Sequence, residues 1–240
     1  MSILISYLDG DATKRLHIND YDKILHKGRV KCPEGHDVVG KKGEKVVWHY
    51  AHTKGQECEA SREMGPWHRW WQDRVEIDCL EIRMKRGGKL HIADMQNGDD
   101  TVVEFQKSVV RPEIIREREE FYGNMIWVFC CNDLVTKIVK QIGRYMKLKV
   151  SQGSRFFLEA RKKSFLDFDR RGVLELLEVG ATRKTNTILF VRIWTISEFD
   201  QIYMRGCLKE KASGRIDRQP YSFDEIAEKF EDVKKLLNSK

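Results

Sequence analysis

The chain has 240 residues, 41% of them hydrophobic, and its 44 lysine and arginine residues outnumber its 37 aspartate and glutamate residues, which gives a formal net charge of +7. This composition excludes a disordered protein and is sufficient to bury one full hydrophobic core. The excess of positive charge favours a polyanionic partner such as DNA.

The first twenty residues lack the basic segment, apolar run and cleavage site of a secretory signal. The apolar stretches, of which MIWVFCC is an example, are too short to span a bilayer. We therefore expect an intracellular protein, cytoplasmic or nuclear, that is not secreted and has no membrane partner.

Residues 1 to 59 are predicted to form a small β-rich subdomain. Three β-prone pieces separated by glycine turns, GRVKCP, GHDVVGKKG and EKVVWHYAH, are typical of a small antiparallel sheet. The segment also contains thiol and imidazole groups of the kind that build a structural Zn²⁺ site, and the candidate ligands are Cys32, His36, His49, His52 and Cys58. The alternative for His49 and His52 is that they pack in the subdomain or contact DNA at a strand end.

Residues 60 to 147 are predicted to form an α/β core, a mixed sheet flanked by helices. A helix is expected over residues 63–80, because Pro66 suits a first helical turn and the tryptophans that follow recur at helical spacing. Three strands are expected in residues 79–108, followed by a helix from Pro112 to Gly123 and by the buried strand MIWVFCC. Beyond Asp133 the apolar pattern predicts another helix, which contains Leu134, Ile138, Val139 and Ile142.

Residues 148 to 240 are predicted to form a separate mixed β/α domain, because a strand pattern restarts after the helical segment. RFFLEA, GVLELLEVG and TILFVRIWTI are the expected β segments. Ser222 as N-cap and Glu225 in the capping-box position predict a terminal helix.

A β-hairpin in the predicted core carries the candidate catalytic residues. Asp94 lies late in one strand, and Glu104 and Gln106 lie on the returning strand, where period-two alternation puts both on one face and turns Lys107 away. Two carboxylates on adjacent strands form an oxygen site suited to Mg²⁺ or Mn²⁺. The alternative is that Asp94 and Glu104 are ordinary residues on the solvated side of a hairpin.

The order helix, three strands, helix, strand is the core topology expected of PD-(D/E)xK nucleases. Within it stand four short motifs: WHYAH at 48–52, WHRWWQ at 67–72, HIADM at 91–95 and EFQKS at 104–108. With these motifs the chain resembles the competence protein CoiA-like family over about residues 30 to 131. One position departs from the family pattern, because Gln72 stands where the helix motif usually has lysine.

The resemblance implies a restriction-endonuclease-like fold and a role in DNA recombination or processing. Together with the carboxylate pair, it leads us to expect a metal-dependent DNA nuclease that hydrolyses phosphodiester bonds in recombination, repair or processing. It also implies that Asp94, Glu104, Gln106 and His68 are the catalytic residues, with Asp94 and Glu104 as ligands of Mg²⁺ and His68 near the scissile phosphate. The rival hypotheses are an inactive nuclease-fold module that binds DNA and a zinc-containing interaction adaptor.

Basic residues close to the hairpin are the predicted contacts to the DNA backbone. A homodimer is a further expectation, because cleavage of both strands of a duplex often uses two active sites. The predicted DNA-contacting residues are Lys85, Arg86, Lys89 and Lys107.

Overall fold

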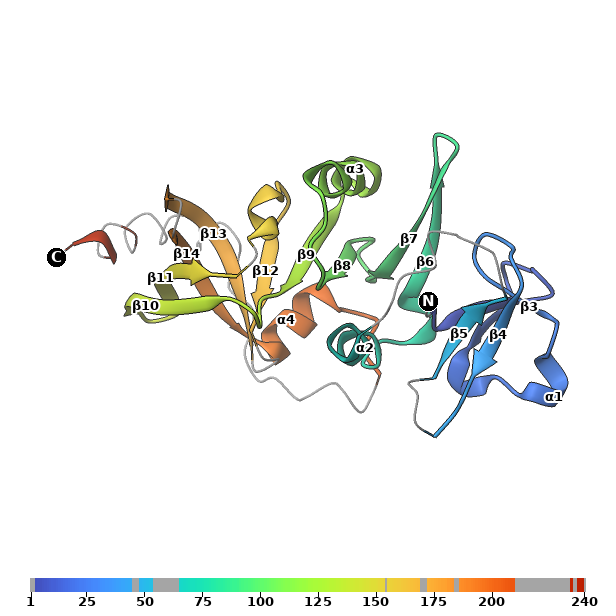
Figure 1. Ribbon diagram of the computed structural model, residues 1–240. Coiled ribbons are helices and arrows are strands. Elements are labelled where there is room, and N and C mark those ends of the chain that lie inside the picture. Colours follow the sequence, from blue (N-terminus) through green and yellow to red (C-terminus); the bar gives the residue numbers. More distant parts are fainter. Residues whose placement is uncertain are drawn as a thin grey trace. The chain divides into compact units, whose positions relative to one another are not determined.

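The computed structural model describes residues 3–44, 48–53, 65–153, 155–168, 172–183, 186–209, 234 and 237–239. It shows a mixed α/β protein with a large nine-stranded sheet, small N-terminal sheets and four helices, which confirms the expected class (Figure 1). The chain divides into two compact units, Met1–Gln96 and Asn97–Lys240. None of the helices among the described residues is long and apolar enough to cross a membrane.

The N-terminal unit begins with two small antiparallel sheets, as predicted for this region. The first has the order β2-β1-β3, and the second pairs β4 with β5. Single bridges, Ile3 with Tyr50 and Lys31 with Asp37, connect the segments. The elements are β1 (Ile5–Leu8), β2 (Arg15–His17), α1 (Lys23–His26), β3 (Val30–Lys31), β4 (Val38–Lys41) and β5 (His49–His52).

The same unit continues with α2 (Pro66–Gln72), the 3₁₀ turn Ile77–Cys79, and the antiparallel pair β6 (Leu80–Arg86) and β7 (Lys89–Gln96). Pro66 starts α2 as expected. The prediction that the helix extends to residue 80 is wrong, because α2 ends at Gln72 and a turn and a 3₁₀ turn follow. Val75 and Ile77 are β-branched and disfavour further helical turns.

The C-terminal unit opens with β8 (Val102–Gln106), α3 (Pro112–Tyr122) and β9 (Met125–Cys130), all at the predicted places. Pro112 starts α3, and Gly123 ends it with φ of +70°, a conformation that glycine adopts without strain. β8 and β9 pair in parallel, and every residue of β9 is buried.

The segment after Asp133 is a strand, β10 (Val135–Ile142), and the predicted helix there is wrong. β10 pairs antiparallel with β11 (Tyr145–Gln152) through a turn at Gly143, whose φ is +55°. Val135, Thr136, Ile138 and Val139 are β-branched, so their side chains fit a strand better than a helix.

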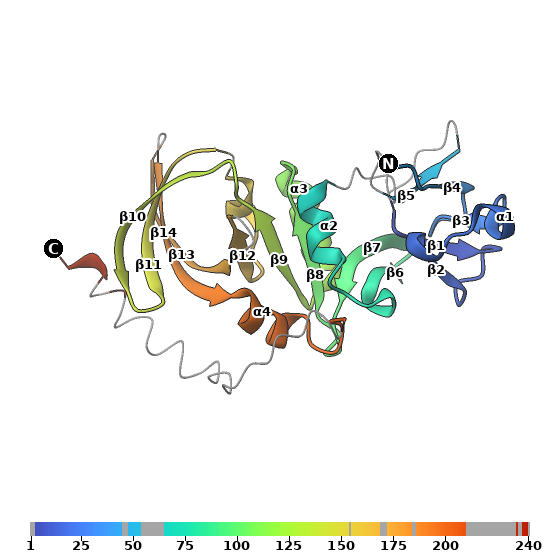
Figure 2. The same ribbon diagram turned by 90° about the horizontal axis from the view of Figure 1, so that it is seen from below.

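The remaining strands of this unit extend the sheet past β9. In sheet order the strands are β10-β11-β14-β13-β12-β9-β8-β7-β6, and β12 pairs with β9 in parallel. RFFLEA, expected as β structure, forms the 3₁₀ turn Phe156–Glu159, and the Ser222 and Glu225 helix start lies outside the described residues. The further elements, which Figure 2 shows from below, are β12 (Ser164–Asp167), β13 (Gly172–Arg183), β14 (Asn186–Thr195) and α4 (Ile196–Tyr203).

Candidate functional site

Asp94 and His68 form a pair in the N-terminal unit. The Nε2 atom of His68 lies 3.3 Å from Oδ1 of Asp94, and the two side chains are 18% and 21% exposed. His68 comes from α2, and Gln72, one turn later on the same helix, donates a hydrogen bond from Nε2 to the backbone oxygen of Asp94 at 3.4 Å. Residues of α2 therefore contact both the side chain and the backbone of Asp94, and its carboxylate remains partly exposed to solvent.

Gln72, at the position where the CoiA-like pattern has lysine, is fully buried. Its Oε1 atom accepts no hydrogen bond from the described residues. A buried carbonyl oxygen without a donor is destabilising unless water or a ligand satisfies it. Gln72 therefore offers an acceptor next to Asp94, and it cannot supply the positive charge of a lysine.

Glu81 is a fourth polar residue of this cluster, after Asp94, His68 and Gln72, and it was not among the predicted site residues. Leu80 and Ile82 pair with Met95 and Ala93, so Glu81 stands across the strand pair from Asp94. Its backbone has φ of +44°, a strained value for a non-glycine residue. The alternation of Leu80, Ile82 and Met84 with polar residues favours a solvated Glu81, and only the positive φ and the burial identify it as special.

The carboxylate of Glu81 is held by the N-terminal strand. The backbone N–H of Leu4 donates to both carboxylate oxygens, at 2.9 and 3.1 Å, and the N–H of Ile5 donates to Oε2 at 3.0 Å. Burial raises the pKa of Glu81 to about 7, against the lowering effect of these two N–H groups and with a smaller raising effect from Asp94. Glu81 therefore anchors β1 and titrates near neutral pH.

We expect the pKa of Glu81 to make stability depend on pH. A glutamate whose pKa is 4.5 when unfolded and about 7 when folded stabilises the protein fully below pH 4.5. This contribution, up to roughly 3 kcal/mol, is lost as the pH rises to about 7. Glu81→Gln has no such carboxylate and does not show this loss. The free energy of unfolding of the wild type therefore falls relative to that of the variant as the pH rises from 4.5 to 7.

Denaturant unfolding of both proteins at a series of pH values measures the difference. Glu76→Gln replaces an exposed glutamate of the same unit and serves as the control. A difference between wild type and Glu81→Gln that stays constant from pH 4.5 to 7 contradicts the prediction.

Glu104 and Gln106 lie on β8, two residues apart and therefore on one face of the strand, as alternation predicted. Glu104 is only 1% exposed, and its Oε2 atom forms an ion pair with Arg118 of α3. Gln106 donates from Nε2 to the backbone oxygen of Ser108 at 2.7 Å. Lys107 is exposed just after the strand. Glu104 is thus paired with an arginine from the next helix.

Arg118 was missed among the predicted site residues, although the sequence contains a signal for it. Ile115, Arg118, Glu119 and Tyr122 recur at helical spacing, and all four are buried in α3. Glu119 uses its Oε1 atom to accept from Nε1 of Trp127 at 3.0 Å and from two backbone N–H groups, those of residues 161 and 162. The inner face of α3 therefore carries two buried charged residues, Arg118 and Glu119, beside the core residues Ile115 and Tyr122.

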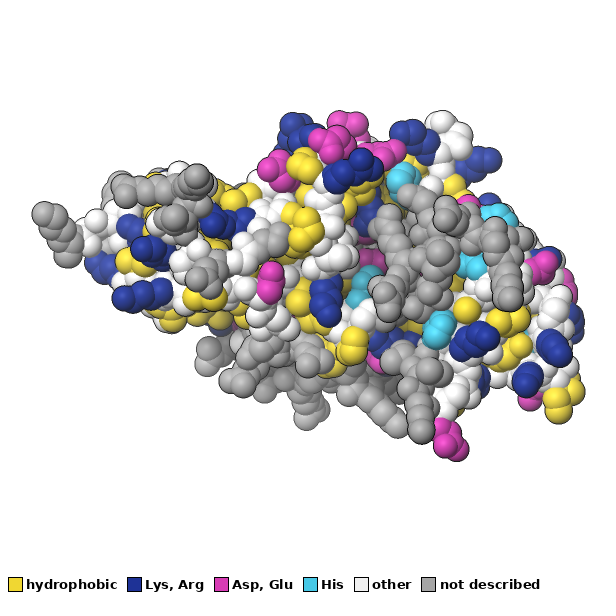
Figure 3. All heavy atoms as spheres, viewed as in Figure 1, with side chains coloured by type: hydrophobic (Ala, Val, Ile, Leu, Met, Phe, Trp, Pro, Cys, Tyr) yellow, Lys and Arg dark blue, Asp and Glu magenta, His cyan; other side chains and the backbone are white. Residues whose placement is uncertain are grey.

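The predicted DNA-contacting residues Lys85, Arg86 and Lys89 lie at the exposed tip of the β6–β7 hairpin. A different distribution of charge is seen on the outer face of α3, where basic and acidic side chains alternate (Figure 3). Arg116 there pairs with Glu113 at 3.2 Å. Of these two surfaces, the hairpin tip is the one with an excess of positive charge.

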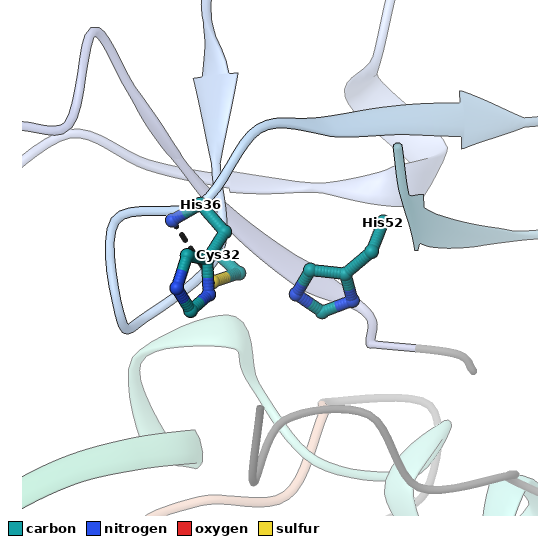
Figure 4. Close-up of side chains that lie close together, drawn as sticks. All are labelled: Cys32, His36 and His52. Atoms are coloured by element: carbon teal, nitrogen blue, oxygen red, sulfur yellow. Dashed lines mark hydrogen bonds between the residues drawn. The ribbon is translucent and has the colours of Figure 1, made fainter. Parts of the chain in front are cut away.

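Three of the five candidate zinc ligands come together. The ligand atoms of Cys32, His36 and His52 all lie within 4.8 Å of one another (Figure 4). His49 is not part of this group, and Cys58 lies outside the described residues. Burial, and to a lesser extent His36, lowers the pKa of His52, which favours the neutral imidazole that metals bind.

Comparison of the chain with protein-family models, with curated proteins and with solved structures found no match.

Proposed function

We propose that the chain is a metal-dependent DNA nuclease of the PD-(D/E)xK type that hydrolyses phosphodiester bonds in DNA recombination, repair or processing. The observation that carries the proposal is the His68–Asp94 pair, a partly exposed carboxylate and imidazole that α2 and β7 hold 3.3 Å apart. This pair, with the buried acceptor of Gln72 beside it, supports a functional site over the alternative of an ordinary solvated hairpin. The finer fold assignment, a restriction-endonuclease-like core, is part of this proposal.

Asp94 and Glu104 are the proposed ligands of Mg²⁺ or Mn²⁺, and their oxygen atoms are of the kind that these ions prefer. The bound ion would polarise the scissile phosphate and lower the pKa of the attacking water. Gln106 orients the water through hydrogen bonds, and His68 donates a proton to, or contacts, the phosphate. Arg118, which forms an ion pair with Glu104, provides a fixed positive charge beside this carboxylate.

A second candidate function is an inactive nuclease-fold module that binds DNA. The buried ion pair favours it, because Oε2 of Glu104 is already engaged by Arg118 and the side chain is nearly inaccessible. In this case the basic hairpin tip binds the phosphate backbone with a steep dependence on salt and no bond is cut.

Incubation of the full chain with labelled single-stranded, duplex and branched DNA, in Mg²⁺, Mn²⁺ or EDTA, distinguishes the two functions. Fluorescence anisotropy on the same substrates at several salt concentrations measures binding separately. Cleavage that requires the metal supports the nuclease, and salt-sensitive binding without cleavage supports the inactive module. A chain that neither binds nor cuts any of the three substrates contradicts both.

A further inference from the structure

We propose that Cys32, His36 and His52 bind a zinc ion that joins the two small sheets of the N-terminal unit. The site is independent of the proposed nuclease centre. Its ligands come from both sheets: Cys32 directly follows β3 of the first sheet, His36 shortly precedes β4, and His52 ends β5 of the second.

The ligand geometry is already close to that of a bound ion. Zn–S and Zn–N bonds in tetrahedral arrangement place the sulfur and nitrogen atoms about 3.6 Å apart. The Sγ atom of Cys32 lies 3.5 Å from Nδ1 of His36, and all three ligand atoms are within 4.8 Å of one another. The three side chains converge in Figure 4, so a small rotation of His52 completes a three-ligand site.

Backbone hydrogen bonds fix the position of the Cys32 sulfur and the turn that follows it. The backbone N–H of His36 donates to the Cys32 sulfur at 3.3 Å, and the N–H of Gly35 donates to the Cys32 carbonyl at 2.9 Å. Gly35 permits this tight turn with φ of +89°. The turn therefore holds the sulfur of Cys32 close to the ring of His36.

A hydrogen bond between thiol and imidazole explains only part of the arrangement. It accounts for Cys32 and His36, but it gives no reason for a third ligand, His52, at the same place. Thiolate with two imidazoles is a donor set that selects zinc over Mg²⁺ or Ca²⁺, which prefer oxygen. Three protein ligands leave the fourth position of a tetrahedral ion for water or a further donor.

The size of the sheets explains why an ion is useful here. The strands of both sheets contain only two to four residues, and single bridges connect them. Small substructures of this kind bury little apolar surface, and a structural metal commonly supplies the missing stability. Zinc at this position would hold β3, β4 and β5 together.

Metal titration of the purified full chain tests the proposal, after removal of bound metal with a chelator. One equivalent of Co²⁺ is expected to give the visible bands of a tetrahedral ion and a sulfur-to-cobalt charge-transfer band. One equivalent of Zn²⁺ is expected to abolish both. Cys32→Ser and His52→Ala should weaken zinc binding by at least about a hundredfold, since loss of outer partners alone costs 10–100-fold.

His49→Ala provides the matched control, because His49 lies on the same strand but outside the cluster. It is expected to bind zinc as tightly as the wild type. His52→Cys keeps a ligand at the site and should strengthen the charge-transfer band, which separates loss of a ligand from loss of folding. Absence of the cobalt spectrum, equal effects of His49→Ala and His52→Ala, or an unchanged band in His52→Cys overturns the proposal.

Discussion

Replacement of Asp94 by asparagine is expected to slow metal-dependent cleavage of DNA by at least about a hundredfold. The substitution keeps the shape of the side chain and removes the negative charge that faces His68 at 3.3 Å and that we propose to bind the cation. A catalytic ion contributes several kcal/mol to stabilisation of the transition state, and each tenfold of rate corresponds to about 1.4 kcal/mol. Initial cleavage rates at saturating Mg²⁺, with DNA affinity measured in parallel, give the comparison.

Asp99→Asn is the matched control for this variant. Asp99 is an exposed residue of the turn that follows β7, so its substitution should leave the cleavage rate unchanged. DNA binding by Asp94→Asn should also persist, because the basic residues proposed to contact the phosphates are retained. An Asp94→Asn variant that cuts as fast as the wild type rules out Asp94 as a ligand of the catalytic ion.

Replacement of Arg118 by methionine is expected to lower the free energy of unfolding by about 3–5 kcal/mol. Arg118 and Glu104 are 4% and 1% exposed and form an ion pair, so the substitution leaves a buried carboxylate without its partner. Removal of both charges in Glu104→Gln/Arg118→Met should cost less than Arg118→Met alone, because no unpaired charge remains. Equilibrium unfolding in denaturant provides all these values.

Arg116→Met is the control on the same helix. Arg116 is partly exposed and its ion pairs with Glu113 and Glu159 lie at the surface, where such pairs contribute at most about 1 kcal/mol. If Arg118→Met is no more destabilising than Arg116→Met, the Arg118–Glu104 pair is not a major determinant of stability.

Elements with local start and stop signals were predictable from the sequence. Pro112 and Gly123 mark the ends of α3, and Gly87 and Gly88 turn the chain between β6 and β7 with φ of +56° and +80°. β10 was wrongly predicted as a helix, because Leu134, Ile138 and Ile142 follow helical spacing, although the β-branched residues of the segment favour a strand. Ile138 and Val139 are 55% and 50% exposed, whereas a prediction from apolar spacing assumes that such residues are buried.

The candidate site was predictable only where short motifs marked it. Asp94 and His68 stand in such motifs, and the structure brings them together. The contacts of Glu81 and Arg118 could not be predicted, because their partners are distant in the sequence. Glu81 accepts hydrogen bonds from Leu4 and Ile5, and Arg118 pairs with Glu104 of β8, and neither contact follows from local spacing. The separation of His49 from His52 does follow from local spacing, because residues three apart in a strand face opposite sides.

The position of β9 limits how the protein can be divided. β9 has β8 on one side and β12 on the other, both in parallel register, and all six of its residues are buried. A fragment that ends at residue 147 would therefore lack β12 and leave one edge of β9 with its peptide groups unpaired. Because this edge belongs to the apolar segment MIWVFC, such a fragment would present a template for intermolecular strand pairing and would aggregate.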